Sequence, residues 1–288
     1  MSRQFYIGCA VWSFKDWVGD LYPQGSRAGD FLSLYSQRLT AVEGNTTFYS
    51  VPSESMVQRW KSETSSEFKF CLKLPRDITH QGELMPRFEE AAAFLDRVKP
   101  LGDRLGPFFV QLPPSYSPAQ FTDLETFLTR WDRATYPISV EVRHLDWFRP
   151  QQTEDLNSML QKLGIGRVLL DSRPMYQTPD DPQVASERKK PQVPLQPYLT
   201  SDFSIVRYIS HPDSDLNQKY LAEWTERIRQ WLDQGTTVYF FVHCPIEARS
   251  PGLLRRFQHQ LEQAAVRVES LPWDSCQDNT PAQLSLFE

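Results

Sequence analysis

Residues Ile138–Trp147 read ISVEVRHLDW, and this stretch decides the fold class. Apolar and polar side chains alternate along it, so that Val140 and Val142 share one face while Glu141 and Arg143 share the other. Helical patterns precede and follow the stretch, as they do around a strand of a β/α repeat. We therefore expect both valines to face a layer of helices. The two charged side chains then point into a barrel, where a charge is stable only if it is paired or used.

The same alternation of strands and helices recurs along the chain. It predicts a single (β/α)₈ TIM-like barrel of the α/β class rather than an open doubly wound sheet. No Gly-x-Gly-x-x-Gly follows a strand, which weakens a dinucleotide-binding alternative, and we predict no cofactor. The expected strands are Phe5–Cys9, Ala41–Glu43, Phe68–Leu74, Phe108–Leu112, Ile138–Arg143, Arg167–Asp171, Ile205–Ile209 and Val238–His243. The expected helices are Gly29–Arg38, Ser53–Glu63, Pro86–Val98, Pro118–Trp131, Gln152–Leu163, Asp215–Asp233 and Pro251–Val266.

Two segments interrupt this alternation. Ser172–Ser201 is long and proline-rich, and it takes the place of the sixth helix. Long loops of this kind are active-site covers or disordered segments, and its position after a strand predicts a mobile cover for a pocket. The last residues are polar and poorly patterned. We therefore divide the chain into a barrel domain, residues 1–269, and a flexible C-terminal tail, residues 270–288.

Composition narrows the class of protein. The chain has 288 residues, 40% of them hydrophobic, which suits one large domain. Its net charge of -5 and pI of about 5.6 give no global sign of a nucleic-acid or membrane surface. No apolar run approaches the ~20 residues of a membrane span, and no signal segment precedes the first strand. The four cysteines lack CxxC spacing, so we expect reduced thiols in a cytoplasmic protein.

The C-terminal ends of barrel strands and the loops after them carry the chemistry in this fold. Polar side chains collect at these positions, and strand parity directs most of them inward. The candidate catalytic residues are Glu43, Lys73, Glu141, Asp171 and His243. The candidate substrate-binding residues are Trp12, Asn45, Tyr49, Arg76, His80, Gln111, Arg143, His144, Trp147 and Arg207.

Charge balance among these residues indicates an anionic ligand. Glu43, Glu141 and Asp171 are expected to share the upper barrel with Lys73, Arg143 and Arg207, and burial demands such near balance. An internal ion-pair network that only fills the barrel would give the same pattern, but the aromatic residues in the adjoining loops favour a ligand pocket. No HxH or HExxH spacing supports a metal site. The cations would repel a divalent ion and attract a phosphate or carboxylate.

Five linked motifs resemble the YecE-like family, which is known as domain of unknown function 72. They are IGCAVWSFKDWVGDLYP from Ile7, VEGNTTFY from Val42, FCLKLPRDITH from Phe70, LGPFFVQLPP from Leu105 and EVRHLDWF from Glu141. The resemblance runs from about Tyr6 to Phe257. It implies a TIM-barrel-like fold and brings no established reaction.

The predicted function is an enzyme, such as a hydrolase or lyase, that acts on a small anionic or phosphate-bearing substrate. Glu141 and Glu43 are the candidate base and acid, because paired carboxylates in unlike surroundings can split their pKa values. Lys73, Arg143 and Arg207 would hold the anionic group. One alternative is a ligand-binding or adaptor barrel without catalysis. Another is a glycosidase-like hydrolase, which the excess of cations makes the lesser choice.

The tail carries a motif of its own. Gln283–Phe287 reads QLSLF and resembles the pentapeptide by which bacterial replication and repair proteins dock on the DNA sliding clamp. Leucine and phenylalanine anchors would fill an apolar groove and Gln283 would fix the register, since few buried anchors supply most of such an affinity. The predicted partner-binding residues are Gln283, Leu284, Leu286 and Phe287. There are two alternatives to clamp binding: the motif is a chance match, or it docks onto the chain's own barrel. Clamp binding would indicate that the substrate is derived from nucleic acid.

Overall fold

The computed structural model describes residues 3–178, 182–183 and 189–276. Each of the eight expected strands is present, and their bounds differ from the prediction by a few residues at most. The strands are β1 (Phe5–Cys9), β2 (Ala41–Gly44), β3 (Lys69–Leu72), β4 (Phe108–Gln111), β5 (Ile138–Glu141), β6 (Gly166–Asp171), β7 (Phe203–Ile209) and β8 (Thr237–His243).

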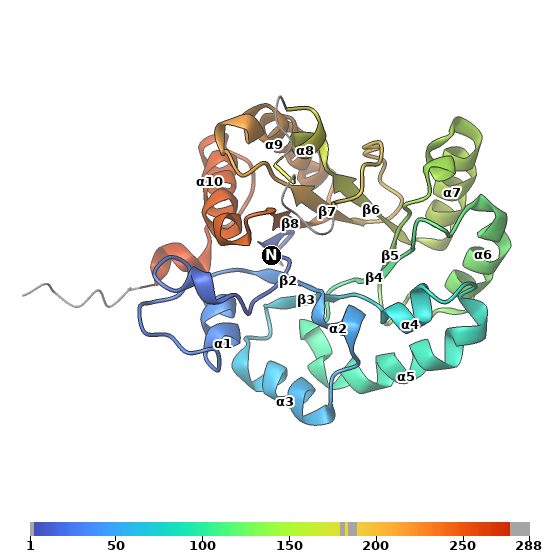
Figure 1. Ribbon diagram of the computed structural model, residues 1–288, viewed down its shortest axis with the longest axis horizontal. Coiled ribbons are helices and arrows are strands. Elements are labelled where there is room, and N and C mark those ends of the chain that lie inside the picture. The colour runs from blue at the N-terminus through green and yellow to red at the C-terminus, as the bar shows by residue number, and fades with distance from the viewer. Residues whose placement is uncertain (1–2, 179–181, 184–188, 277–288) are drawn as a thin grey trace, which may run out of the picture.

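A ring of helices surrounds these strands (Figure 1). The longer helices fall where the amphipathic patterns predict them, and three one-turn helices that are too short for such a pattern follow β2, β3 and β6. The longer helices are α1 (Phe31–Ser36), α3 (Glu54–Glu63), α5 (Phe88–Val98), α6 (Phe121–Arg130), α7 (Pro150–Leu163), α9 (Gln218–Asp233) and α10 (Ser250–Gln263). The one-turn helices are α2 (Thr46–Tyr49), α4 (Arg76–Thr79) and α8 (Arg173–Tyr176).

The strands are parallel, and their hydrogen-bonded order is β1-β8-β7-β6-β5-β4 in one ladder and β2-β3 in another. An isolated bridge between Lys73, directly after β3, and Phe109 of β4 joins these two strands. Sequential parallel strands with helices between them form the predicted TIM-like (β/α)₈ barrel. The ladder is interrupted at two places, between β3 and β4 and between β1 and β2.

A tyrosine hydroxyl joins β1 to β2 where the ladder is interrupted. Tyr35 Oη accepts a hydrogen bond from Cys9 N at 2.6 Å and donates one to Ala41 O at 3.1 Å. Gly8 makes this close approach possible, since a Cβ atom there would lie 1.8 Å from Ala41 O. Any larger residue at position 8 would push the two strands apart.

The two faces of the barrel strands have different surroundings. Val140 and Val142 belong to the same buried cluster as helix residues such as Leu124 and Leu156, so the predicted outward face of β5 is confirmed. A separate cluster of buried side chains fills the inside of the barrel at the N-terminal end of the strands. Its members are Tyr6, Ala41, Cys71, Phe109, Val168, Phe203, Ile205, Tyr239 and Phe241. With this apolar filling below, the charged side chains of the barrel interior gather at the C-terminal end.

The long segment after β6 lies partly on the barrel. Beyond α8, Gln196 accepts hydrogen bonds from Thr153 and Arg167, and Thr200 donates to Ile165 O at 2.7 Å. These contacts lie where the other repeats place a helix, which agrees with the prediction that this segment replaces the sixth one. All four cysteines are free thiols, three of them buried.

The barrel packing continues past residue 269, where the sequence analysis begins the flexible tail. Leu271 and Trp273 are buried, and Trp273 N donates to Arg38 O at 3.1 Å. Asp274 forms an ion pair with Arg255 of α10 at 2.8 Å. Residues 270–276 therefore belong with the barrel. The remaining part of the predicted tail, with the clamp-like motif, lies outside the described residues. Among the described helices, none has the length and apolar character needed to cross a membrane.

Candidate functional site

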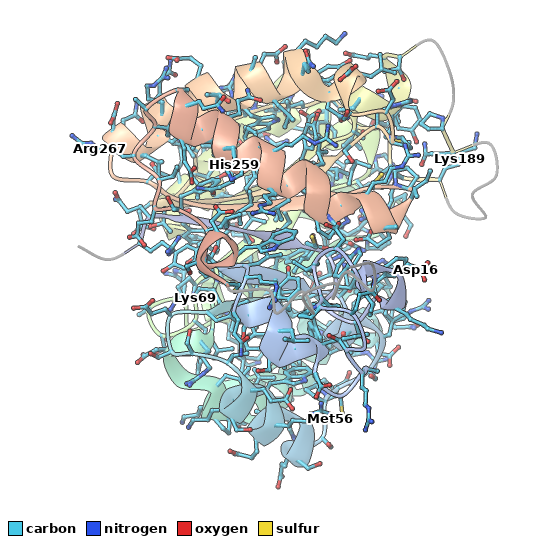
Figure 2. The ribbon with its side chains drawn as sticks, turned by 90° about the vertical axis from the view of Figure 1, so that its left-hand side faces the viewer. Asp16, Met56, Lys69, Lys189, His259 and Arg267 are labelled. Carbon is cyan, nitrogen blue, oxygen red and sulfur yellow. The ribbon has the colours of Figure 1, made fainter. Side chains whose placement is uncertain are left out.

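A cavity of about 570 Å³ lies at the C-terminal ends of the strands. Figure 2 shows Lys189, which lines the cavity, and Lys69, which begins β3, on opposite sides of the molecule. The cavity is therefore far from the N-terminal end of β3. Every lining residue is at a strand end, in a loop after a strand or in the proline-rich segment. The lining consists of Ala10, Val11, Asn45, Phe48, Tyr49, Lys73, Arg76, His80, Gln111, Arg143, Leu170, Lys189, Lys190, Pro191, Arg207, Ile209, His243 and Glu247.

Glu43, which is fully buried, is the centre of a polar network beneath this cavity. Its carboxylate lies 2.7 Å from Lys73 Nζ and 2.7 Å from His243 Nε2, and it accepts two hydrogen bonds from Arg207 at 2.8 and 2.9 Å. Burial by itself raises the pKa of Glu43, but Arg207, His243 and Lys73 hold that pKa well below its usual range. Glu43 is therefore an ionised anchor for three side chains.

Glu141 is tied into the same network. Arg143 Nε donates to its carboxylate at 2.6 Å and Arg207 Nη1 donates at 2.7 Å. Burial opposes ionisation, yet the two arginines lower the pKa of Glu141 to about 2. Because Arg207 contacts both carboxylates, it connects β2, β5 and β7 through the barrel. The prediction that Lys73, Glu141 and Arg207 point inward and form one polar cluster is confirmed.

Two basic groups of the network, Lys73 and His243, have lowered pKa values. Burial and the nearby Arg207 lower the pKa of Lys73 to about 7. The Lys73 ammonium also donates a hydrogen bond to Asn45 Oδ1. Burial lowers the pKa of His243 to about 4, with Arg207 adding to the effect and Glu43 opposing it. His243 is therefore neutral at pH 7 and donates its Nε2 hydrogen to Glu43. Asn45 in turn donates to Ala10 O at 2.8 Å, which fixes its side chain beside Lys73.

Aromatic rings form the side of the cavity that follows β2 and β3. Phe48 lies edge-on to Tyr49, with ring centroids 5.3 Å apart, and edge-on to His80, with centroids 5.0 Å apart. Burial, with Arg143 and Arg76 nearby, lowers the pKa of His80 to about 4, so this ring is neutral at pH 7. Tyr49 is 62% exposed at the rim.

The structure adds residues that the sequence analysis did not select. Lys190 reaches the cavity from the proline-rich segment; its backbone N donates to Gln183 Oε1 at 2.6 Å and its carbonyl accepts from Tyr176 Oη. No periodic pattern marks Lys190, so sequence alone offers no signal for it. Lys189, Lys190 and Pro191 of this segment line the pocket, as its position after β6 suggested. Whether it moves stays a prediction.

Glu247 is another residue of the lining that the sequence analysis did not select. It begins a short 3-10 helix, η7 (Glu247–Arg249), four residues after β8, and its carbonyl accepts a hydrogen bond from Trp17 Nε1 at 3.0 Å. Burial raises the pKa of Glu247 to about 7, with Ser250 and Lys190 opposing the rise. Its position in the loop after a strand is the signal that could have identified it.

The prediction that Asp171 is an inward catalytic acid is wrong. Its carboxylate accepts hydrogen bonds from Trp224 Nε1 of α9 at 2.8 Å and from Arg173 Nε and Nη2 at 2.9 Å each. Val168 and Leu170 occupy the inner face of β6, so parity turns Asp171 to the helix layer. Asp171 anchors α8 to α9.

Three of the predicted substrate-binding residues also lie outside the cavity lining. Trp147 is fully buried and donates to Tyr116 O at 2.9 Å, and Trp12 packs edge-on to Trp60 with centroids 5.3 Å apart. His144 Nδ1 accepts from Asp146 N at 3.1 Å and caps the short helix η5 (Leu145–Phe148). The structure therefore places these three side chains outside the candidate site, in contacts that stabilise the loops, and their contact with a substrate stays an untested prediction.

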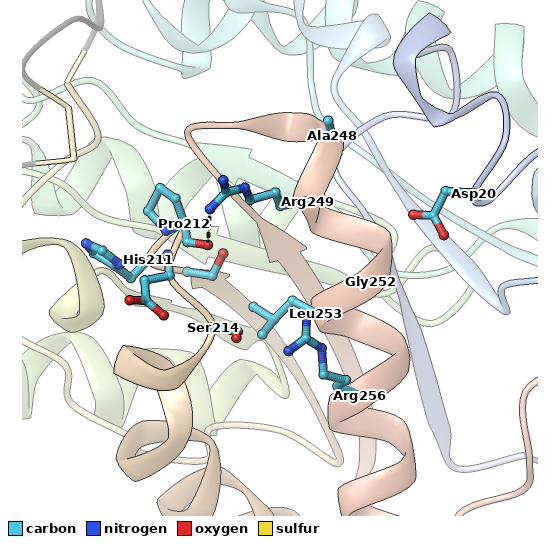
Figure 3. A pocket seen from close by; sticks show the side chains of 11 residues that line it. Asp20, His211, Pro212, Ser214, Ala248, Arg249, Gly252, Leu253 and Arg256 are labelled. Carbon is cyan, nitrogen blue, oxygen red and sulfur yellow. Dashed lines mark hydrogen bonds between the residues drawn. The ribbon is translucent and has the colours of Figure 1, made fainter.

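A second hollow, of about 500 Å³, lies between the loop after β7 and α10 (Figure 3). Arg249 extends toward this loop and donates to Pro212 O at 2.7 Å. The lining arginines Arg249 and Arg256 are matched there by Asp20 and Asp213. This hollow therefore has no excess charge. In the part of the chain that the structure describes, no three His, Cys, Asp or Glu side chains gather as a metal site.

Fold and site together define a TIM-like barrel with a cationic cavity at the C-terminal ends of its strands. The family described as protein of unknown function DUF72 matches residues 6–276, and the chain belongs to this family. It is 33% identical to UPF0759 protein YecE of Escherichia coli K12 over 286 residues, or 98% of this chain and 99% of that protein. The resemblance stated from the five motifs is thereby confirmed.

A crystal structure of a DUF72 family protein from Enterococcus faecalis V583 has a similar fold. The TM-score is 0.69 with 19% sequence identity, over 90% of this chain and 98% of that chain. A second crystal structure of a DUF72 family protein from the same organism gives a TM-score of 0.66 at 19% identity and covers 97% and 99% of the two chains. At this identity the likeness concerns the fold alone.

Proposed function

We propose that this protein is an enzyme that acts on a small anionic or phosphate-bearing substrate by carboxylate acid/base chemistry. The observation that carries the proposal is the charge of the cavity lining. Among the described residues of the lining, six have cationic side chains and one, Glu247, has a carboxylate; the six are Lys73, Arg76, Arg143, Lys189, Lys190 and Arg207. Glu43 and Glu141 lie directly behind, and the cations still outnumber the acids. Such a surplus in a partly enclosed site favours an anion.

Arg143 is the best placed donor for the anionic group. It gives Nε to Glu141, and no described residue accepts a hydrogen bond from its two Nη groups. Pairing with Glu141 fixes the guanidinium plane, so these donors are already oriented before a ligand arrives. Arg207 differs, because it gives all three of its nitrogens to Glu43 and Glu141.

Proton transfer is assigned to Glu247 instead of the pair Glu43 and Glu141. Both members of that pair have lowered pKa values, so neither has a proton to give near neutral pH. Burial brings the pKa of Glu247 to about 7 in the same cavity, which suits a general acid or base. In this assignment Glu43 and Glu141 position the cations. The same observation disfavours a glycosidase-like mechanism by those two residues, which needs a protonated acid.

Calorimetric titration with inorganic phosphate at constant ionic strength tests anion binding. Wild-type protein is expected to bind, and Arg143→Gln to bind at least about tenfold more weakly because a charge-assisted bidentate contact is lost. Arg97→Gln on the surface of α5 is the matched control and is expected to bind like wild type. Equal binding by wild type and Arg143→Gln contradicts the proposal.

Turnover of a panel of phosphorylated metabolites tests catalysis. Glu247→Gln is expected to abolish turnover while phosphate affinity stays within about tenfold of wild type, because chemistry depends on interactions gained in the transition state. Unchanged turnover by this variant rules out the role of Glu247. Phosphate binding without turnover of any compound by wild type would favour the alternative of a binding or adaptor barrel.

A further inference from the structure

We propose that the cavity binds a nucleotide, with its phosphate among the cations and its base stacked on Tyr49. This inference rests on the proposed function, since it takes for granted that the site binds phosphate. It adds a base to the phosphate-bearing substrate, because the cations account for the phosphate alone. Three features of the site support it: an aromatic side, the position of that side opposite Arg207 and Lys190, and an amide in the lining that bonds to no described residue.

The aromatic side is built around Tyr49. This ring lines the cavity, stands 62% exposed and rests edge-on against Phe48, which itself rests against His80. Packing on Phe48 holds the ring in place from behind, while the exposed face remains open to a ligand. Aromatic rings that are held in this way stack on nucleobases of any sequence, because each base has a π face.

Part of the cationic group lies across the barrel mouth from the aromatic rings, while Lys73 and Arg76 follow β3 on the aromatic side. Phe48, Tyr49 and His80 follow β2 and β3, whereas Arg207 belongs to β7 and Lys190 to the segment between β6 and β7. The strand order places β2 and β3 across the barrel from β6 and β7. A ligand that uses both sides therefore carries a flat ring at one end and an anionic group at the other. A volume of about 570 Å³ is within the range of small-molecule sites.

Gln111, which ends β4, supplies the third feature. Its side chain is only 6% exposed and lines the cavity, and no described residue forms a hydrogen bond with its amide. The amide therefore faces the cavity, where a ligand or water can satisfy it. An amide both donates and accepts, as do base edges and ribose hydroxyls. An inorganic anion alone would leave the donor-acceptor pair of Gln111 half satisfied.

The sequence of the tail points in the same direction. Gln283–Phe287 resembles a motif of proteins that work on DNA, and this observation is independent of the cavity. A strand end and a free mononucleotide present the same chemistry, a phosphate beside a base. We therefore treat them as two sources of one ligand.

The test compares ligands that differ by one part. Adenosine monophosphate and cytidine monophosphate are titrated beside ribose 5-phosphate and inorganic phosphate by calorimetry. Both nucleotides are expected to bind at least about tenfold more tightly than ribose 5-phosphate, since stacking on one aromatic ring supports such a factor. Tyr49→Ala is expected to remove this preference and leave phosphate affinity unchanged. Tyr49→Phe is expected to keep it, as is the control Tyr198→Ala, a tyrosine 55% exposed outside the lining.

Each outcome has a distinct meaning. Equal binding of ribose 5-phosphate and the nucleotides overturns this inference and leaves the proposed function intact. Equal binding of phenyl phosphate and the nucleotides also overturns it, because a ring then suffices without a base. Absence of all phosphate binding overturns the proposed function first. A 5′-phosphorylated oligonucleotide that binds more tightly than the mononucleotides supports a strand end as the source; the reverse order supports a free nucleotide.

Discussion

At the scale of single residues, Arg207 has the largest influence on the site. It is buried and contacts both Glu43 and Glu141, so two carboxylates depend on one guanidinium. Burial opposes its charge, but the two carboxylates raise the pKa of Arg207 further above its usual range. A buried charge of this kind stabilises only as long as its partners remain. The same pairing orients Arg143 through Glu141.

Arg207→Met removes that charge while keeping most of the side-chain volume. We expect a loss of about 3 to 5 kcal/mol in the free energy of unfolding, because two buried carboxylates lose their main partner. Urea denaturation provides the measurement. Adding Glu43→Gln and Glu141→Gln to this variant is expected to recover much of the loss. A loss below about 1 kcal/mol in the single variant would show that the charges are solvated.

The pKa of Glu141 predicts how the free energy of unfolding depends on pH. Its pKa is about 2 in the folded protein against 4.5 in the unfolded chain, so the unfolded chain binds more protons between these values. The stabilisation from its ion pairs is therefore complete above about pH 5 and is lost as the pH falls toward 2. The difference in unfolding free energy between wild type and Glu141→Gln should shrink by roughly 3 kcal/mol over that range. A constant difference would contradict the ion pairs.

At the scale of elements, the segment after β6 shows how one strand serves two purposes. Leu170 points into the cavity, whereas Asp171 binds Arg173 and Trp224 on the outer side. The strand thus contributes to the lining and holds the start of the segment that carries Lys190. An acid at a strand end is an anchor here and has no contact with the cavity.

Asp171→Ala separates these two roles. The buried Trp224 indole would lose its acceptor, so we expect the free energy of unfolding to fall by about 2 to 3 kcal/mol. Phosphate affinity is expected to stay within about twofold of wild type, because Asp171 does not line the cavity. Chemical denaturation and calorimetry together check this. Normal stability with lost phosphate binding would restore the site role first predicted for Asp171.

At the scale of the whole molecule, the barrel is divided along its axis. Apolar side chains fill it toward the N-terminal ends of the strands, and the ion network with the cavity above it occupies the C-terminal ends. The family match ends at residue 276, and the motif Gln283–Phe287 follows it. The catalytic proposal and the docking proposal therefore concern separate parts of the chain and can be tested independently.

We predict that Gln283–Phe287 docks on the bacterial DNA sliding clamp with micromolar affinity. Two or three apolar anchors in a groove support an affinity of this order. Calorimetric titration of the full chain with clamp is the measurement. Leu286→Ala combined with Phe287→Ala should abolish binding, while Ser285→Ala at the intervening position should leave it unchanged. The proposal fails if the intact chain does not bind clamp.

The sequence alone was enough to predict the barrel fold and the inward-facing residues of the polar network at its centre. Period-two patterns and the β/α alternation determine which side of a strand faces inward, so Lys73, Glu141 and Arg207 were assigned correctly. These are local properties: they depend on neighbours along one strand and on the helices beside it. One-turn helices such as α2 have no period to detect.

Only the tertiary structure decided which of these groups hold each other and which can work. Asp171 points to the helix layer because Val168 and Leu170 take the inner face of β6, and the contact with Trp224 holds its carboxylate there. Glu247 joins the site from one loop and Lys190 from another, through contacts that no local pattern encodes. The pKa of Glu43 is low because Arg207, 164 residues away in sequence, lies against it, while burial raises that of Glu247. Protonation depends on distances between groups and on exclusion of water, and both exist only after the chain has folded.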